Sequence, residues 1–177
     1  MSDSPLTELL RDAGLPGRRI TAARNEFVTR QGTIDTNLYL VESGSLRVYM
    51  LEGNEERIVR FGYPRDMITP IDSFLTGKPT DFFIQAIRKT EVLALPRVEV
   101  LAFIQSDSRH LALWNATLEE LVLQQMEREK DLLIQSPRLR YERILRRSPQ
   151  LFQEIPHRHI AGYLRMTPET LSRLKKS

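Results

Sequence analysis

The sequence predicts an α+β chain in which a β-rich half is followed by one long helix and a small all-helical end. Short apolar runs separated by turn residues lie between Arg18 and Pro96, a helical stretch without Pro or Gly runs from Ser108 to Ile134, and helical periodicity returns beyond Pro137. The 177 residues, 41% of them hydrophobic, are enough for one large domain or two small ones.

The β-rich half is preceded by a short amphipathic helix over Pro5 to Ala13, which Ser4 is expected to cap and Gly14 to end. Strands are then expected at Arg19–Ala22, Glu26–Thr29, Leu38–Glu42, Ser45–Leu51, Glu56–Phe61, Asp81–Arg88 and Glu91–Leu95. Many short strands with no long helix between them fit a sandwich, a jelly roll or a small barrel.

Alternation of side chains predicts which strand residues face the core. In the stretch from Leu46 to Met50, apolar residues alternate with Arg47 and Tyr49, as in an antiparallel strand with one buried face. We therefore expect Leu46, Val48 and Met50 to point inward.

A short helix at Arg97–Gln105 leads into the long helix, which carries a wide apolar stripe with a seven-residue repeat. Such a stripe predicts a coiled-coil seam between two copies of the chain. The interface residues expected from it are Leu111, Trp114, Leu118, Leu121, Val122, Gln125 and Leu132. The stripe is also wide enough to pack against the barrel of its own chain, and the two interpretations are compatible.

Ser136-Pro137 ends the long helix and predicts a hinge, because the residue before proline disfavours helical geometry. One more helix is expected at Leu139–Arg147. The stretch from Ile155 to Lys176 then predicts two short helices joined by a tight turn at Arg165-Met166, with Thr167 as the N-cap of the second.

The exposed face of that second helix has the chemistry of a major-groove reader. Its candidate DNA-binding residues are Thr167, Pro168, Glu169, Thr170, Ser172, Arg173, Lys175 and Lys176. Arg173 can make a bidentate contact to guanine, Glu169 can accept a hydrogen bond from cytosine, and the lysines can neutralise phosphates. The alternative is an amphipathic helical hairpin that does not read DNA, in a ligand-binding or interaction module.

Charge is divided unevenly along the chain, whose net charge is only +3. Residues 138–177 carry ten basic side chains against three acidic ones, whereas residues 1–137 carry sixteen against twenty. A basic module attached to a mildly acidic body favours DNA binding, although a solvated basic helix face would give the same count.

The composition argues against several other classes of protein. Without cysteine the chain has no disulfide, thiolate nucleophile or cysteine-ligated cluster. The three histidines, His110, His157 and His159, lie outside the expected strands, and no phosphate-binding loop or nucleophile motif occurs, so we expect neither an enzyme, a metal nor a cofactor. The N-terminus resembles no signal peptide and no apolar run reaches membrane length, so we expect a cytoplasmic protein without a membrane partner.

Three long motifs in this order resemble the Crp/Fnr family of bacterial transcription regulators. They are LYLVESGSLRVYMLEGNEE at Leu38–Glu56, QAIRKTEVLALPRVEVLAFI at Gln85–Ile104, and RYERILRRSPQLFQEIPHRHIAGYLRMTPETLSRLKK at Arg140–Lys176. The last looks most like the branch common in Bacteroidetes.

The resemblance implies an antiparallel jelly-roll barrel (a double-stranded β-helix), a dimerisation helix and a C-terminal helix-turn-helix domain, over residues 1–107, 108–135 and 136–177. It implies a homodimer that binds double-stranded DNA, with RNA polymerase as a further partner. Pro168, Glu169 and Arg173 occupy the family's base-reading positions, and the family often has Arg where Pro168 stands.

The expected effector site departs from the pattern of the family. Members that bind cyclic nucleotides carry a Gly-Glu pair for the ribose and an Arg-Ser or Arg-Thr pair for the phosphate. Thr69-Pro70 and Thr80-Asp81 stand in register with them, and Asp81 would repel a phosphate. Lys78 and Arg88 are the nearby basic residues. We therefore expect an effector pocket that includes Thr69, Lys78, Thr80, Asp81 and Arg88, with either an unknown small molecule other than cyclic AMP or no effector at all.

Overall fold

Two antiparallel four-stranded sheets form the barrel of a computed structural model that describes residues 4–176. One sheet has the order β1-β8-β3-β6 and the other β2-β7-β4-β5. The strands are β1 (Arg18–Ala22), β2 (Phe27–Thr29), β3 (Asn37–Ser43), β4 (Leu46–Glu52), β5 (Glu55–Gly62), β6 (Met67–Ile68), β7 (Phe83–Ala86) and β8 (Thr90–Pro96). The antiparallel β-rich half predicted from the apolar runs is confirmed.

The core of the barrel lies between the two sheets. Tyr39, Val41 and Val92 from the first sheet pack with Leu46 and Ile84 from the second, and all five are buried. Their burial removes apolar surface from water on both sheets at once, and this holds the sheets together.

The turn between β3 and β4 requires glycine. Gly44 has φ +84°, and a Cβ atom on it would lie 2.3 Å from the carbonyl oxygen of Lys89. The backbones of the two turns can approach this closely only without a side chain at that position.

The prediction that Met50 faces the core is wrong. Leu46 and Val48 are buried between the two sheets as expected. Met50 is exposed because β4 continues past β7 at this point, and the last residue of β4 that pairs with β7 is Tyr49. Tyr49 lies on the opposite face of β4, where it is buried in a separate cluster and stacks on Phe83.

Three helices cover one end of the barrel: α1 (Pro5–Asp12), α2 (Ile71–Thr76) and α3 (Arg97–Gln105). Leu10, Phe74 and Ile104, one from each, are buried in a second core together with Leu38 and Leu95. The short helix α2 and the strand β6 were not predicted from the sequence. The cap of α1 also differs from expectation, because the Ser4 backbone carbonyl accepts the hydrogen bond and its side chain does not.

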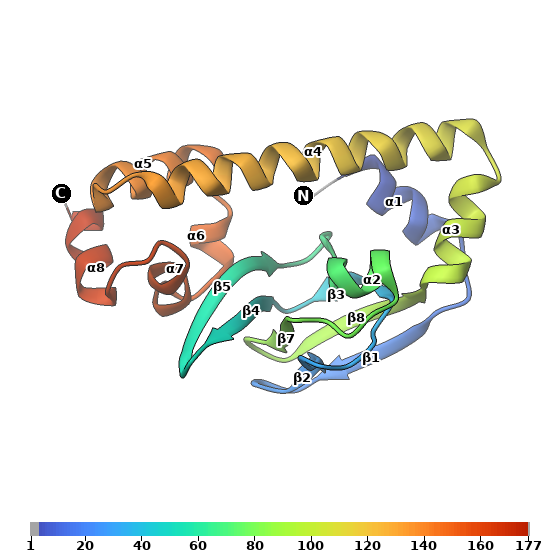
Figure 1. The fold of residues 1–177 in the computed structure, drawn as a ribbon, viewed down its shortest axis with the longest axis horizontal. Coiled ribbons are helices and arrows are strands. Elements are labelled where there is room, and N and C mark those ends of the chain that lie inside the picture. The colour runs from blue at the N-terminus through green and yellow to red at the C-terminus, as the bar shows by residue number, and fades with distance from the viewer. Residues whose placement is uncertain (1–3, 177) are drawn as a thin grey trace.

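Helix α4 (Ser108–Leu133) runs along the whole molecule, from α3 at one end to the C-terminal helices at the other (Figure 1). The side chain of Asp107 caps it by accepting a hydrogen bond from the Arg109 N–H at 2.7 Å. No helix within residues 4–176 is both long and apolar enough to cross a lipid bilayer.

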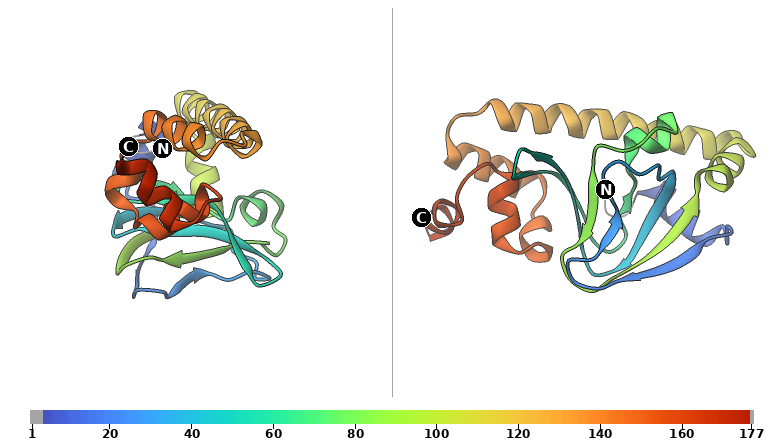
Figure 2. Two further views of the ribbon diagram at one scale, coloured as in Figure 1. Left: turned by 90° about the vertical axis from the view of Figure 1, so that its left-hand side faces the viewer. Right: turned by 60° about the horizontal axis from the view of Figure 1, so that its bottom comes forward.

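The C-terminal helices are α5 (Pro137–Arg147), α6 (Leu151–Glu154), α7 (His157–Tyr163) and α8 (Pro168–Lys176). Helix α5 runs alongside the far end of α4, and the other three lie below it, with α7 next to the β4–β5 hairpin (Figures 1 and 2). Helix α7 rests on β5, where the rings of Phe61 and Tyr163 lie 5.4 Å apart. Helix α5 begins two residues earlier than predicted because Pro137 occupies its first turn and Ser136 caps it. Ser177, the last residue of the expected 136–177 domain, and residues 1–3 of the expected 1–107 domain lie outside the described residues.

Candidate nucleic-acid interface and ligand cavity

The turn between α7 and α8 has the predicted cap. Arg165 adopts φ +51° in this turn, and the Thr167 hydroxyl accepts a hydrogen bond from the Thr170 N–H at 3.2 Å. The two threonine hydroxyls lie 3.1 Å apart and form a second hydrogen bond. The Thr167 side chain thereby pairs with both the N–H and the hydroxyl of Thr170 at the start of α8.

Helices α7 and α8 pack through small and branched apolar side chains. Ile160, Ala161, Leu164 and Leu171 are fully buried. With that face turned inward, α8 turns a polar face to solvent. Of the eight candidate DNA-binding residues on α8 and its cap, Thr170 is half-buried. The other seven are exposed: Thr167, Pro168, Glu169, Ser172, Arg173, Lys175 and Lys176.

The exposed face of α8 carries a carboxylate at its start and cations toward its end. A hydrogen bond from its own backbone N–H, followed by one from Thr167, lowers the pKa of Glu169 below its usual value. Lys175 Nζ lies 2.6 Å from His157 Nε2 on α7. The face therefore offers an ionised acceptor beside Arg173 and a cationic end, which is the chemistry needed for base edges and phosphates.

Buried ion pairs fix the C-terminal helices to α4. Asp131 on α4 is fully buried and accepts hydrogen bonds from Arg143, at 2.9 Å, and Arg147. The guanidinium of Arg128 stacks 3.6 Å above the centre of the Tyr163 ring and donates to the Tyr163 carbonyl. A shift of α4 would therefore move α5 and α7 with it.

The expected interface stripe on α4 divides into two parts. Trp114, Leu118 and Leu121 are half-buried against the body of the same chain. Leu111 and Val122, the latter 59% exposed, face solvent, and Leu132 is half-buried near the end of the helix. Gln125 is also exposed. Three more apolar side chains extend the exposed part: Leu123, Met126 and Leu133.

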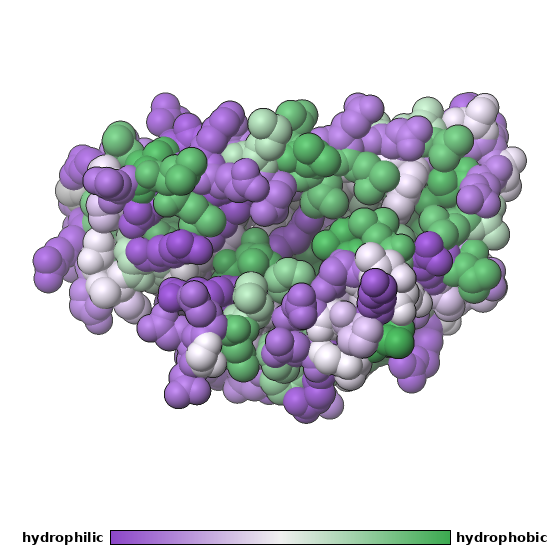
Figure 3. Space-filling model, viewed as in Figure 1, coloured by the Kyte–Doolittle hydropathy of each residue, from purple (hydrophilic) through white to green (hydrophobic). Residues whose placement is uncertain are grey.

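A cavity of about 420 Å³ lies between α4 and the barrel. We call it the groove cavity. Its apolar walls are Leu38, Val48, Val59, Met67, Ile68, Ile71 and Phe82 from the barrel side, and Trp114, Leu118, Leu121 and Val122 from α4. The polar residues in its lining are Arg60, Thr69, Thr117 and Gln125. Apolar side chains gather along the groove between α4 and the barrel, over β5 and α2 (Figure 3).

Arg60 on β5 is the one charged residue that lines the groove cavity within the described chain. Burial lowers its pKa below the ordinary value for arginine, while the carboxylates of Asp66 and Glu120 act in the opposite direction. Arginine stays protonated at neutral pH even so, because its ordinary pKa lies far above it. The sequence drew no attention to Arg60, since nothing local indicates that α4 closes over this position.

Of the five expected effector residues, only Thr69 lines the groove cavity. The buried Thr80 hydroxyl donates to Asp72 at 2.7 Å, and Asp72 also accepts from the Asp81 N–H at 2.8 Å. Lys78 is exposed beyond the end of α2. These three positions therefore lie outside the cavity walls.

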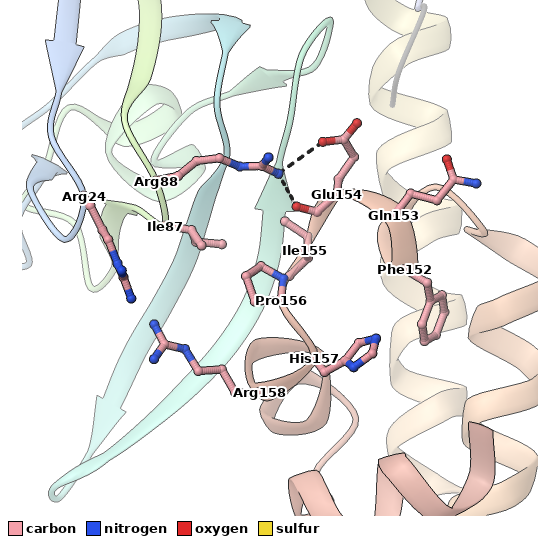
Figure 4. A pocket seen from close by; sticks show the side chains of 10 residues that line it. All are labelled: Arg24, Ile87, Arg88, Phe152, Gln153, Glu154, Ile155, Pro156, His157 and Arg158. Atoms are coloured by element: carbon pink, nitrogen blue, oxygen red, sulfur yellow. Dashed lines mark hydrogen bonds and ion pairs between the residues drawn. The ribbon is translucent and has the colours of Figure 1, made fainter. Parts of the chain in front are cut away.

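Arg88, the fifth, lines a second and more open cleft of about 750 Å³ between the barrel and the C-terminal helices (Figure 4). It donates to the Glu154 carbonyl and pairs with the Glu154 carboxylate at 3.2 Å. The guanidinium groups of Arg24 and Arg158 point toward one another across this cleft. Arg88 therefore joins the two parts of the chain and lies away from the groove cavity.

Comparison with known proteins identifies a family for the barrel and similar solved structures for nearly the whole chain. A family model described as the cyclic nucleotide-binding domain matches residues 19–107. No curated protein matches the sequence.

Solved structures of similar fold extend over nearly the whole chain. A CooA mutant from Carboxydothermus hydrogenoformans superimposes with a TM-score of 0.77 at 19% identity, covering 99% of this chain and 84% of that one. FixK2 from Bradyrhizobium japonicum gives 0.74 at 21% identity, with 92% and 84% covered. The catabolite activator protein of Thermus thermophilus gives 0.59 at 25% identity, with 98% and 83% covered. The likeness thus includes the barrel, α4 and the C-terminal helices.

Proposed function

The chain belongs to the cyclic nucleotide-binding domain family, and on that premise we propose that it is a sequence-specific DNA-binding transcription regulator of the Crp/Fnr type. Residues 1–107 are its sensor domain, residues 108–135 its dimerisation helix and residues 136–177 its helix-turn-helix DNA-binding domain. The similar folds of FixK2, CooA and the catabolite activator protein, which extend beyond the barrel, support this assignment.

The observation that carries the proposal is the polar face of α8. A capped turn fixes its first residues outward, where Glu169 and Arg173 are both exposed. The burial of Leu171 against α7 leaves this face free to enter a major groove, where Lys175 and Lys176 would lie near phosphates. The other helices within residues 4–176 offer no comparable combination of exposed carboxylate, guanidinium and lysines on a short capped helix.

The dimer is part of the proposal. A helix-turn-helix reads one half-site, and two half-sites one turn of DNA apart need a protein with two-fold symmetry. The exposed apolar side chains of α4 supply a surface for that contact, from Leu111 through Val122 and Met126 to Leu133. RNA polymerase is the further partner, and the cytoplasm is the compartment in which DNA and polymerase are available.

The groove cavity is the effector site in this proposal. Since Trp114, Leu118 and Val122 line it, an occupant contacts the dimerisation helix directly. Asp131 and Arg128 couple α4 to the DNA-binding domain, so we propose two states that differ in the position of α4 and hence in the placement of the recognition helices. An effector changes DNA affinity only if it binds one of these states more tightly.

Arg173→Ala tests DNA reading. On this proposal the substitution costs about 1–3 kcal/mol of binding free energy on the preferred duplex and relaxes sequence preference, because it removes a base contact. Fluorescence anisotropy with the preferred duplex and a scrambled one measures both effects. Lys89→Ala, an exposed lysine in the barrel, is the matched control and should leave both unchanged. Unchanged affinity and preference in Arg173→Ala would make α8 a structural helix.

A further inference from the structure

The groove cavity combines an apolar lining with a single arginine, and this combination specifies a class of ligand. We propose that it binds a small amphiphilic carboxylate, such as a medium-chain fatty acid, with the carboxylate on Arg60 and the chain along α4. That such a ligand regulates DNA binding rests on the proposed function. That the ligand binds in the cavity does not.

The apolar part of the argument is the lining. Eleven of the fifteen lining residues are apolar, including Val59, Met67, Phe82, Trp114 and Leu121, and the volume of about 420 Å³ falls in the range of small-molecule sites. Apolar walls favour a ligand whose hydrocarbon part leaves water on binding. Each buried methylene raises the association constant by roughly a factor of four.

The polar groups in the lining are few for a ribose or a base. The hydroxyl of Thr69 already donates to the Asn37 carbonyl at 2.9 Å, and that of Thr117 to the Leu113 carbonyl at 2.9 Å. The amide of Gln125 and the indole N–H of Trp114 are left as the neutral side-chain donors in the lining. A sugar with several hydroxyl groups would bury polar atoms without partners, which costs binding energy.

The anionic end of the ligand is assigned to Arg60. A guanidinium has five N–H donors in a planar fork that matches a carboxylate, so it can hold a ligand carboxylate while it also interacts with protein groups. Asp66, which accepts a hydrogen bond from the Tyr63 N–H, and Glu120, which is exposed on α4, are carboxylates whose charges act on Arg60. Neither lines the cavity.

A carboxylate on Arg60 would also place the apolar chain against the dimerisation helix. Arg60 lies on β5, and the facing wall from Trp114 to Gln125 belongs to α4. The occupant therefore fills the space between barrel and α4, and its length changes the contact area on the helix.

Isothermal titration of the full chain tests the ligand class, with decanoate, decanol and cyclic AMP as probes. We expect decanoate to bind at least tenfold more tightly than decanol, octanoate to bind more weakly than decanoate by about fourfold per missing methylene, and cyclic AMP to give no heat. Equal affinity for decanoate and decanol, tight binding of cyclic AMP, or no binding of decanoate would overturn the proposal.

A pair of arginine variants on β5 locates the site. Arg60→Met should weaken decanoate at least tenfold and leave decanol unchanged, whereas Arg57→Met, which alters an exposed ion pair at the hairpin, should leave both unchanged. If Arg60→Met does not fold, the difference in affinity between decanoate and decanol in the unaltered protein tests the ligand class by itself. DNA anisotropy on the same samples keeps the two proposals separate, because loss of decanoate binding with intact DNA binding contradicts only the ligand class.

Discussion

The pKa of His159, a residue on α7 close to the barrel, is set by burial and by the charges around it. It is 9% exposed, and its Nε2 accepts a hydrogen bond from Arg158 Nε at 3.2 Å. Burial lowers the pKa of His159 to about 4, and the positive charges of Arg47, Arg158 and Arg24 act in the same direction, against Glu56. The imidazole is therefore neutral at pH 7 in the folded protein.

This arrangement predicts acid sensitivity between two pH values. Below pH 6.5, the ordinary histidine pKa, His159 is protonated in the unfolded chain. In the folded chain it stays neutral down to about pH 4. The free energy of unfolding should therefore fall on acidification through this window, by up to about 3 kcal/mol from this group. Denaturant unfolding of His159→Gln at several pH values should show a flatter dependence, with His157→Gln, at an exposed ring, as control. An identical slope in His159→Gln and the unaltered protein would disprove the assignment.

Elements were predictable where their signals are local, and not where they depend on distant partners. The apolar runs of β3 and β8, the turn at Gly44 and the Thr167 cap all follow from neighbouring residues. The bulge at Val59 in β5 and the two-residue strand β6 depend on pairing with other strands, and no period is visible over so few residues.

The same distinction applies to the candidate site. The exposed face of α8 follows from its own periodicity. The role of Arg60 does not, because α4, which closes the groove cavity over it, begins 48 residues further along the chain at Ser108. The expected effector residues were placed by register with a family pattern, and Lys78, Thr80 and Asp81 follow directly after α2, a helix that the sequence did not reveal.

At the scale of elements, the joint between α4 and α5 depends on Asp131. Asp131→Asn leaves Arg143 and Arg147 without their buried carboxylate, with only the more exposed Glu127 nearby. Because both arginines are partly exposed and keep Glu127 as a partner, the loss should lower the free energy of unfolding by about 1–3 kcal/mol. Urea denaturation measures it, with Glu129→Gln, an exposed carboxylate on the same helix, as the matched control. A change below about 0.5 kcal/mol would mean that the joint does not depend on this pair.

At the scale of the whole molecule, the exposed apolar side chains of α4 predict a dimer. Leu133 is 81% exposed and Met126 49%, and a partner helix would remove both from water. Sedimentation should give a dimer for the unaltered chain and a monomer for Val122→Glu combined with Met126→Glu. Ile34→Glu with Val98→Glu, which changes two exposed apolar side chains away from α4, should remain dimeric. A dimer that survives the α4 substitutions would place the interface elsewhere.

The most direct test of DNA reading is selection of bound duplexes from a random pool, followed by sequencing. A dimer that presents two copies of α8 should enrich a two-fold-symmetric sequence with half-sites about 34–36 Å apart, one turn of DNA. Arg173→Ala should lose the preference at one position in each half-site. A pool that remains random after repeated rounds, in the presence and absence of decanoate, would contradict the account.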